Sequence, residues 1–298
     1  MENLQALEDY VLVRKIPPTL RKAKKGVIYI LLLFLCIVIS VFFAFPFIYM
    51  VLMSLMKDSA SIFLYPPILY SGELRFQNYI DAWNYIDMGQ KLLNTIIMVV
   101  SSMGIGIVAS ILIAYGFSRF RNRWSNLFFN ILLSTMMIPW VVTMIPAYVE
   151  YEYLGWIGTR LPLIIPRIGG SAFNVFMLRQ FMDDIPLELD EAAKMDGCSS
   201  FRILWQIILP QIKPCLATLF IFSFINAWSD YVGPSIYLQS DSSLFTMSLG
   251  MQQFFSSTGK VDWNLVMAAS VIFSVPMVIV LTACQKAFVR GVVRSGIK

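Results

Sequence analysis

The chain has 298 residues, of which 58% are hydrophobic and 14% are charged, and its mean hydropathy is +0.69. Soluble domains carry about 25% charged residues, so this composition excludes an ordinary soluble protein and predicts a protein that spans a bilayer. The net charge of +5 does not predict nucleic-acid binding, because the basic residues cluster at the ends of apolar runs, as membrane topology alone requires.

Long stretches without any charged residue predict four membrane spans. They lie between Lys25 and Lys57, Lys91 and Arg119, Arg123 and Glu150, and Asp262 and Lys286. Each exceeds the ~20 residues that a helix needs to cross the hydrocarbon layer. Two weaker spans are expected at 161–182, which contains Arg167 and Arg179, and at 212–232, which contains Pro214. Because a backbone in lipid must satisfy its own hydrogen bonds, we predict an all-α polytopic membrane protein with six transmembrane helices.

Basic residues predict the orientation of these spans. The N-terminal tail, residues 1–25, carries six Lys or Arg residues, and the C-terminal tail, about 286–298, carries four. Three more, at 119, 121 and 123, follow the second span. By the positive-inside rule both termini are cytoplasmic, and so is the acidic segment that follows the fourth span.

Several kinds of chemistry are missing from the sequence. There is no histidine, the commonest general base and metal ligand. No Asp or Glu lies inside a predicted span; Asp230 lies only at the edge of one. Because a proton relay in a membrane usually needs a carboxylate or histidine inside the spans, no proton relay is predicted. A sodium-coupled carrier that uses backbone carbonyls remains an alternative. No Walker A loop is present, and the four cysteines have neither disulfide nor zinc spacing. We therefore predict no catalytic residue, no metal site and no cofactor in this chain.

The segment after the fourth span is acidic and helix-forming. Six acids gather in fourteen residues: Asp183, Asp184, Glu188, Asp190, Glu191 and Asp196. We predict a helix over 187–195, capped by an aspartate before Pro186, and a left-handed turn at Gly197. Ser199 or Ser200 is expected to cap a second, amphipathic helix.

The second helix is expected to present an apolar stripe. Its predicted members are Phe201, Leu204, and Ile207 or Ile208, and Pro210 is expected to end the helix. Such a structure is either a docking element or a segment that packs on its own bundle.

The sequence EAAKMDGCSSFRILWQIILP, residues 191–210, resembles the EAA loop of binding-protein-dependent ABC importer permeases. The fixed positions of that pattern fall on Glu191, Ala192, Ala193, Gly197, Ile207, Leu209 and Pro210. Further segments, such as AYGFSRFRNRWSN and FINAWSDYVGPSIYL, are similar to carbohydrate-uptake permeases of the maltose-permease G-like type, and the resemblance covers roughly residues 26–298.

This resemblance implies a type I ABC importer permease in the cytoplasmic or inner membrane of a prokaryote, with a permease domain over 26–298 and an EAA loop at about 183–213. Glu191 would contact an ATPase surface, and Gly197 would set the turn. The expected partners are a second permease subunit, two ATP-binding subunits that hold the ATP and Mg, and an external solute-binding protein. The expected cargo is a sugar or oligosaccharide. A permease for a non-sugar solute and a stand-alone secondary carrier are the alternatives.

Two polar stripes within the weaker spans mark a candidate substrate pathway. Arg167, Ser171 and Asn174 share one helix face. Ser223, Asn226 and Asp230 repeat that spacing beside Trp228. The alternative is that these groups bond neighbouring helices together. An arginine as deep as Arg167 is costly in lipid, and we expect it to favour an acidic or strongly polar glycan.

The last predicted loop outside the cytoplasm, Pro234 to Asn264, is long and carries little charge. Phe254 and Phe255 in this loop are expected to be exposed, and the resemblance implies that the loop contacts the binding protein. Packing of the loop on the chain's own bundle is the alternative.

Overall fold

The computed structural model describes residues 18–57, 73–120, 122–238, 241–255 and 261–295. Every regular element within these ranges is a helix, which confirms the predicted all-α class. Four stretches are long and apolar enough to cross a membrane: Ile28–Ser54, Met88–Arg119, Leu161–Asp183 and Trp263–Gln285. They belong to α2 (Pro18–Ser54), α4 (Met88–Arg119), the series α7, η2 and α8, and α15 (Trp263–Ser295).

The other two predicted spans are bent rather than straight. Between Arg123 and Glu150, α5 (Ser125–Thr135) meets α6 (Trp140–Tyr153) at 95°. Pro139 causes this break, because its extended conformation (φ −60°, ψ 130°) cannot continue a helix. The described residues therefore hold four spans, or up to six if each bent pair counts as one.

The predicted span at 212–232 is shorter in the structure. Here α12 runs only from Lys213 to Trp228 and meets the preceding helical run, Ser200–Gln211, at 84°. Sixteen residues extend about 24 Å at 1.5 Å per residue. Beyond Trp228 the chain leaves the helix at Ser229 and turns into a separate short element, because Asp230 caps that turn, as described below.

Shorter helices connect the long ones. The fourth predicted span consists of α7 (Leu161–Ile164), η2 (Ile165–Gly169) and α8 (Ala172–Asp183). Between α8 and α12 lie α9 (Leu187–Met195), α10 (Ser200–Ile203), the π-helical turn η3 (Leu204–Ile208) and α11 (Leu209–Gln211). The remaining elements are α3 (Gln77–Tyr85), α13 (Val232–Tyr237), η4 (Ser242–Leu244), α14 (Met247–Gly250) and η5 (Met251–Phe255).

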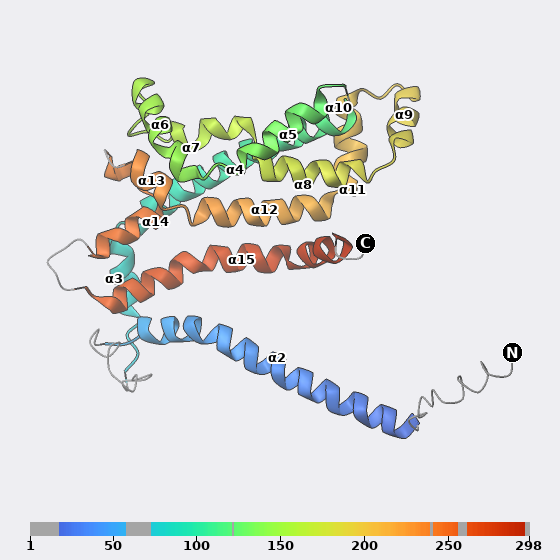
Figure 1. Ribbon diagram of the computed structural model, residues 1–298. Coiled ribbons are helices and arrows are strands. Elements are labelled where there is room, and N and C mark those ends of the chain that lie inside the picture. The colour runs from blue at the N-terminus through green and yellow to red at the C-terminus, as the bar shows by residue number, and fades with distance from the viewer. Residues whose placement is uncertain (1–17, 58–72, 121, 239–240, 256–260, 296–298) are drawn as a thin grey trace.

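The long helices form a bundle with two distinct ends (Figure 1). Helix α4 packs against α8 and α12, and α15 packs against α12 and α2. One end of the bundle holds α9 to α11, together with the start of α2 and the end of α15, and the other end holds α3, α6, α13 and α14. Helix α2 leaves the bundle along most of its length, so its side chains from Ile28 onward are largely exposed.

The predicted terminal tails continue into the helices next to them. Helix α2 already begins at Pro18, so residues 18–25 of the basic tail are helical, and α15 continues to Ser295. Residues 1–17 and 296–298 lie outside the described part of the chain.

The described residues form three apolar clusters, two of which join the long helices at the two ends of the bundle. One lies beside α9 to α11 and joins side chains of α4, α8 and α12 to Ile203, Leu204, Ile208 and Leu209. The second joins α3, α4, α12, α14 and α15 at the opposite end. The segment between α8 and α12 is thus built into the core of the bundle, since burial of apolar side chains is the main favourable term in packing.

Candidate functional site

A cavity of about 430 Å³, called the central cavity below, lies among α4, η2, α8 and α12. It brings together Arg167, Ser171, Asn174 and Asn226, four of the six residues predicted for the substrate pathway, and also Ser223. The remaining lining residues are Ser102, Met103, Gly106, Ile107, Gly170, Phe173, Phe222 and Ala227. Polar groups from two weak spans therefore meet at one place, with α4 as the third wall.

A break in the fourth span shapes this cavity. Gly170 takes a positive-φ conformation (φ 71°, ψ −178°), and Ser171 is extended before α8 begins. The backbone N–H of Ser171 donates to Ser110 Oγ on α4 at 3.0 Å, and that hydroxyl donates to Gly106 O at 2.7 Å. A Cβ on Gly170 would lie 3.2 Å from Ser110 Oγ, so only glycine fits this close approach without strain.

The polar residues of the central cavity differ in their partners. Asn174 is buried, and its Nδ2 donates to Ser223 Oγ at 3.5 Å, a weak bond between α8 and α12. Arg167 and Asn226 are exposed, and within the described residues neither side chain has a hydrogen bond or an ion pair. Interhelical bonding thus accounts for Asn174 and Ser223, whereas the groups of Arg167 and Asn226 are available to a solute.

A second cavity of about 500 Å³ adjoins the first and shares Arg167 and Gly170 with it. Asp230, also predicted for the pathway, lines this one, together with Trp140 and Tyr237. Asp230 Oδ1 accepts the N–H of Gly233 at 3.0 Å, and the side chain therefore also holds the turn into α13.

Tyr237 contributes a phenol to the second cavity. Burial raises the pKa of Tyr237 above its usual range, and the nearby Tyr151 and Asp230 raise it further. The phenol therefore stays protonated at neutral pH and can donate a hydrogen bond.

Trp228 is a correction to the predicted pathway, because it lines neither cavity. It is 2% exposed, and its Nε1 donates to Phe273 O on α15 at 3.1 Å. Two residues along an α-helix turn the side chain by about 200°, so Trp228 faces the core when Asn226 faces the cavity.

The segment between α8 and α12, residues 184–212, is called the α8–α12 loop. Helix α9 has the predicted bounds, and Gly197 has the predicted positive φ, 78°. Cys198 N–H donates to Ala193 O at 2.9 Å and Gly197 N–H to Lys194 O at 3.0 Å, the two bonds of a Schellman motif. Ser199 caps α10 by accepting from Arg202 N. This first half of the loop follows from local sequence alone.

Two local details of the loop differ from the prediction. No aspartate caps α9: its N-cap residue is Pro186, because α8 already extends through Asp183. The helix also continues past Pro210 and bends at Ile212, with Gln211 Nε2 donating to Ile207 O at 3.0 Å.

The predicted apolar stripe is only partly correct. Leu204 and Ile208 are buried, but Phe201 is 64% exposed and pairs with the exposed Trp205, ring centroids 5.9 Å apart. The buried face of this helix is centred on Ile203 and Leu204, and Phe201, two residues and about 200° of helical turn before Ile203, therefore faces away from the core.

The residues predicted to couple this loop to an ATPase divide into two groups. Glu191, Ala192, Gly197 and Pro210 are exposed, whereas Ala193 and Leu209 are buried and Ile207 is half-buried. Met195 is 88% exposed beside them. The loop therefore presents a surface that carries both an acid and large apolar groups, fixed from behind by the core.

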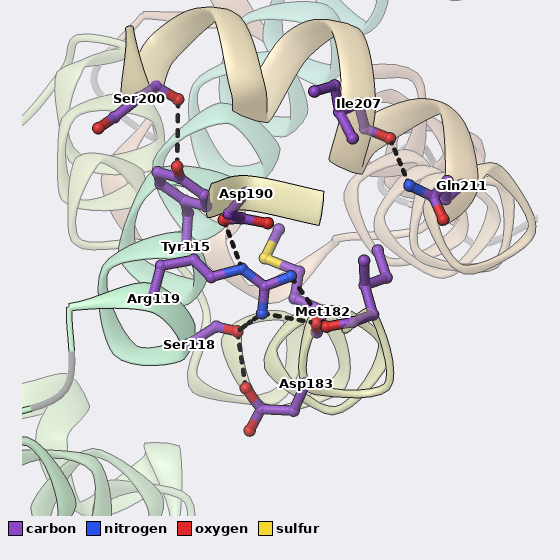
Figure 2. A network of polar contacts seen from close by, with 10 residues as sticks. Tyr115, Ser118, Arg119, Met182, Asp183, Asp190, Ser200, Ile207 and Gln211 are labelled. Carbon is purple, nitrogen blue, oxygen red and sulfur yellow. Dashed lines mark hydrogen bonds and ion pairs between the residues drawn. The ribbon is translucent and has the colours of Figure 1, made fainter. Parts of the chain in front are cut away.

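An ion pair that sequence reasoning missed lies beneath this surface (Figure 2). Arg119 Nε donates to Asp190 Oδ2 at 2.9 Å, and both side chains are 5% exposed. The two residues are 71 positions apart, so no helical spacing indicates the pair. The only signal in the sequence is an acid next to Glu191 and a base at the end of a predicted span.

The segment from Asp241 to Phe255 packs on the bundle. Met247 N–H donates to Thr95 Oγ1 at 2.8 Å, and Asn94 Nδ2 donates to Ser243 O at 2.7 Å. Phe254, expected to be exposed, is 4% exposed and stacks on Tyr85, whereas Phe255 is exposed as expected. Residues 256–260 of this predicted loop lie outside the described ranges.

Comparison with known proteins identifies the family. Residues 106–294 match the family described as "Binding-protein-dependent transport system inner membrane component". The sn-glycerol-3-phosphate transport system permease protein UgpE of Yersinia pestis bv. Antiqua (strain Antiqua) is 36% identical over 245 residues, which cover 80% of this chain and 86% of UgpE. The probable starch degradation products transport system permease protein AmyC of Thermoanaerobacterium thermosulfurigenes is 34% identical over 269 residues, covering 90% and 96%.

A solved structure shares the fold. A chain from a bacterial ABC transporter involved in the import of the acidic polysaccharide alginate superposes with a TM-score of 0.74 at 23% identity, covering 89% of this chain and 98% of that one. With the family match spanning most of the chain, and with two relatives above 30% identity, the protein belongs to the family of binding-protein-dependent transport system inner membrane components.

Proposed function

We propose that this chain is the permease subunit of an ATP-driven ABC importer that moves a sugar or oligosaccharide delivered by an external solute-binding protein. The observation that carries this proposal is the central cavity, whose walls combine amide, hydroxyl and guanidinium groups with the aromatic rings of Phe173 and Phe222. Such groups bind hydroxyls and the apolar faces of sugars. The family is binding-protein-dependent, and AmyC is named for starch degradation products.

The proposal assigns a partner to each exposed surface. A second, different permease subunit would complete the central cavity and cover part of α2, whose apolar side chains face outward. Two ATP-binding subunits would hold the ATP and Mg, so that this chain itself needs no cofactor and is not an enzyme. One of them would dock on the α8–α12 loop through Glu191, Met195 and Phe201, which are all exposed.

The assignment of these partners also gives the orientation of the chain in the membrane. The start of α2, the end of α15 and the α8–α12 loop share one end of the bundle (Figure 1), which we assign to the cytoplasm because the basic residues concentrate there. The opposite end, with the second cavity, would then receive the solute from the binding protein.

Arg167 supports a second candidate, a permease for an acidic solute. Among the described residues that line the central cavity, Arg167 carries the only charge, and Ser171 at the start of α8 adds the positive end of a helix dipole. UgpE is named for sn-glycerol-3-phosphate, an anion, and the superposed structure is from an importer of acidic alginate. The cargo is then an acidic glycan or a small phosphorylated solute.

The experiment that tests the proposed function is purification of the tagged chain from its native membrane, followed by identification of the co-purified proteins by mass spectrometry. A second permease and an ATPase with a Walker A loop are expected, and their complex should transport solute only with ATP and the binding protein. A chain that purifies alone and moves solute without ATP would instead be a stand-alone carrier.

Exchange of Arg167 tests the cargo class. In the reconstituted complex, Arg167→Gln should lower transport of an acidic solute about tenfold relative to a neutral one, the loss expected for one charge-assisted hydrogen bond. Asn226→Ala is the matched control, because it removes an uncharged group from the same cavity and should slow both solutes alike. Unchanged relative rates in Arg167→Gln would contradict an acidic cargo.

A further inference from the structure

One guanidinium group joins three elements at the end of the bundle that holds the α8–α12 loop (Figure 2). Arg119 is the last residue of α4. Its Nε donates to Asp190 on α9, its Nη1 to Met182 O at 2.9 Å, and its Nη2 to Ile185 O at 3.2 Å. The two carbonyls belong to the end of α8 and to the link that follows it, where a helix leaves its last carbonyls without helical partners. Arg119 therefore fixes both the start of the loop and its first helix to α4.

Asp190 differs from its neighbours in the acidic segment. Glu188 and Glu191 are exposed, whereas Asp190 is 4% exposed and turned toward the bundle. Its Oδ1 is buried and has no hydrogen-bond partner among the described residues. A buried carboxylate oxygen without a partner costs free energy, so this ion pair is not arranged for maximal stability. Its position under the loop surface points to a role in function.

A second bond connects the same turn of α4 to the other half of the loop. Tyr115, one turn before Arg119, donates from its hydroxyl to Ser200 O at the start of α10, at 3.1 Å. Ala193 on α9 and Ile203 on α10 pack in the same apolar cluster as Tyr115. Both helices of the loop are thus held by the last turns of one helix, α4.

The same helix also forms a wall of the central cavity. Gly106 and Ile107 of α4 line the cavity, and Ser110 holds the break before α8. From Gly106 to Arg119 the helix is continuous, a distance of about 20 Å at 1.5 Å per residue. A displacement of the loop that is passed to Arg119 therefore reaches the cavity wall through a single rigid element.

We propose that the buried ion pair between Arg119 and Asp190 is the positioning link that passes movement of the α8–α12 loop to α4 and, through α4, to the wall of the central cavity. This inference rests on the proposed function, because it assumes that an ATPase moves the loop. Arg119 and Asp190 touch neither the solute nor the ATPase; they hold the loop and α4 in register while both move.

The test uses the whole complex, with the partner permease, the ATPase subunits and the binding protein, reconstituted in nanodiscs and in vesicles. Asp190→Asn keeps the shape of the side chain and removes its charge. Arg119→Lys keeps the charge but loses the planar fork that reaches several acceptors at once. Each variant should assemble, and binding-protein-stimulated ATPase activity per complex should fall at least about fivefold, the lower range of typical coupling between sites. Solute transported per ATP should fall with it.

The double variant shows whether Arg119 and Asp190 act through one shared bond or contribute independently. If both residues act through one bond, Asp190→Asn combined with Arg119→Lys should be no worse than the more impaired single variant. Asp81→Asn is the matched control, because Asp81 pairs with Arg75 at 3.2 Å in an exposed Arg–Asp pair at the opposite end of the bundle. Exposed pairs contribute little, and this variant should keep wild-type stimulation.

Several results would overturn the link. One is that the Asp190→Asn and Arg119→Lys complexes assemble and keep wild-type ATPase stimulation and wild-type transport per ATP. Another is that fewer complexes form but each keeps wild-type activity, because the pair would then have a merely structural role. If neither variant assembles, Asp190→Glu decides, because it keeps the charge and changes the reach of the side chain by one methylene group: lowered stimulation supports the link and wild-type stimulation overturns it. A wild-type complex without any stimulated ATPase activity would instead contradict the proposed function.

Discussion

At the scale of single residues, the contacts of each side chain show whether it lines the substrate pathway or packs in the core. Asn226 and Trp228 lie two positions apart on α12, yet one lines the central cavity and the other bonds to Phe273 on α15. Asn174 lies between these cases, since it lines the cavity and bonds weakly to Ser223. Polarity in a span therefore identifies candidates, and the facing direction of each side chain decides which of them can meet a solute.

Gly170 gives a prediction at this scale. Gly170→Ala places a Cβ 3.1 Å from Ile113 Cδ1 and forces alanine to φ 71°, ψ −178°, a region that only glycine populates readily and that costs other residues roughly 1–3 kcal/mol. We expect a lower unfolding temperature of the purified protein in detergent and slower transport, because the break beside the cavity shifts. Gly169→Ala is the control, since its Cβ would meet nothing within 4 Å and its φ is not positive. Equal effects of the two substitutions would contradict this account of the break.

At the scale of elements, the α8–α12 loop combines local and tertiary causes. The bounds of α9, the turn at Gly197 and the cap at Ser199 follow from residue types at fixed offsets. The face that the second helix buries does not, because packing against the bundle centres it on Ile203 and Leu204 and leaves Phe201 outside. The loop surface is therefore set partly by its own sequence and partly by the cluster behind it.

The turn at Gly197 gives a prediction for this element. A Cβ there would meet nothing within 4 Å, so any effect of substitution arises from the positive φ alone. Gly197→Val should leave the complex assembled but abolish binding-protein-stimulated ATPase activity, because a β-branched residue resists this conformation. Gly197→Asn should retain most of the activity, since asparagine tolerates the left-handed region. If Asn impaired activity as much as Val, added bulk on the loop surface would be the cause instead.

At the scale of the whole molecule, the two ends of the bundle differ in composition and in construction. One end carries the acidic loop and the ends of α2 and α15, and the other carries short helices that cover the bundle around the second cavity. Helix α4 runs the length between them and touches both the central cavity and the loop. A solute and an ATPase at opposite ends would therefore be connected by one continuous helix.

Labelling of single cysteines tests the orientation of the whole molecule. In a variant without the four native cysteines, produced without its ATPase partners so that the α8–α12 loop is uncovered, Met195→Cys on α9 and Tyr153→Cys on α6 place thiols at positions that are 88% and 92% exposed. These two helices lie at opposite ends of the bundle (Figure 1). In intact protoplasts a membrane-impermeant maleimide should label only Tyr153→Cys, and both should react once the membrane is opened. Labelling of Met195→Cys in intact protoplasts would reverse the assigned orientation.

The sequence by itself determined the apolar helical class, three of the four strongest spans, the helix at 187–195 and the left-handed turn at Gly197, because hydropathy and backbone preference act over a few neighbouring residues. Only the tertiary structure decided that Trp228 and Phe254 are buried, that Arg119 meets Asp190 and that α12 begins with a sharp bend. The physical reason is that removing an apolar side chain from water lowers the free energy whether the side chain then contacts lipid or protein. Its actual neighbour depends on elements that are far away in the chain.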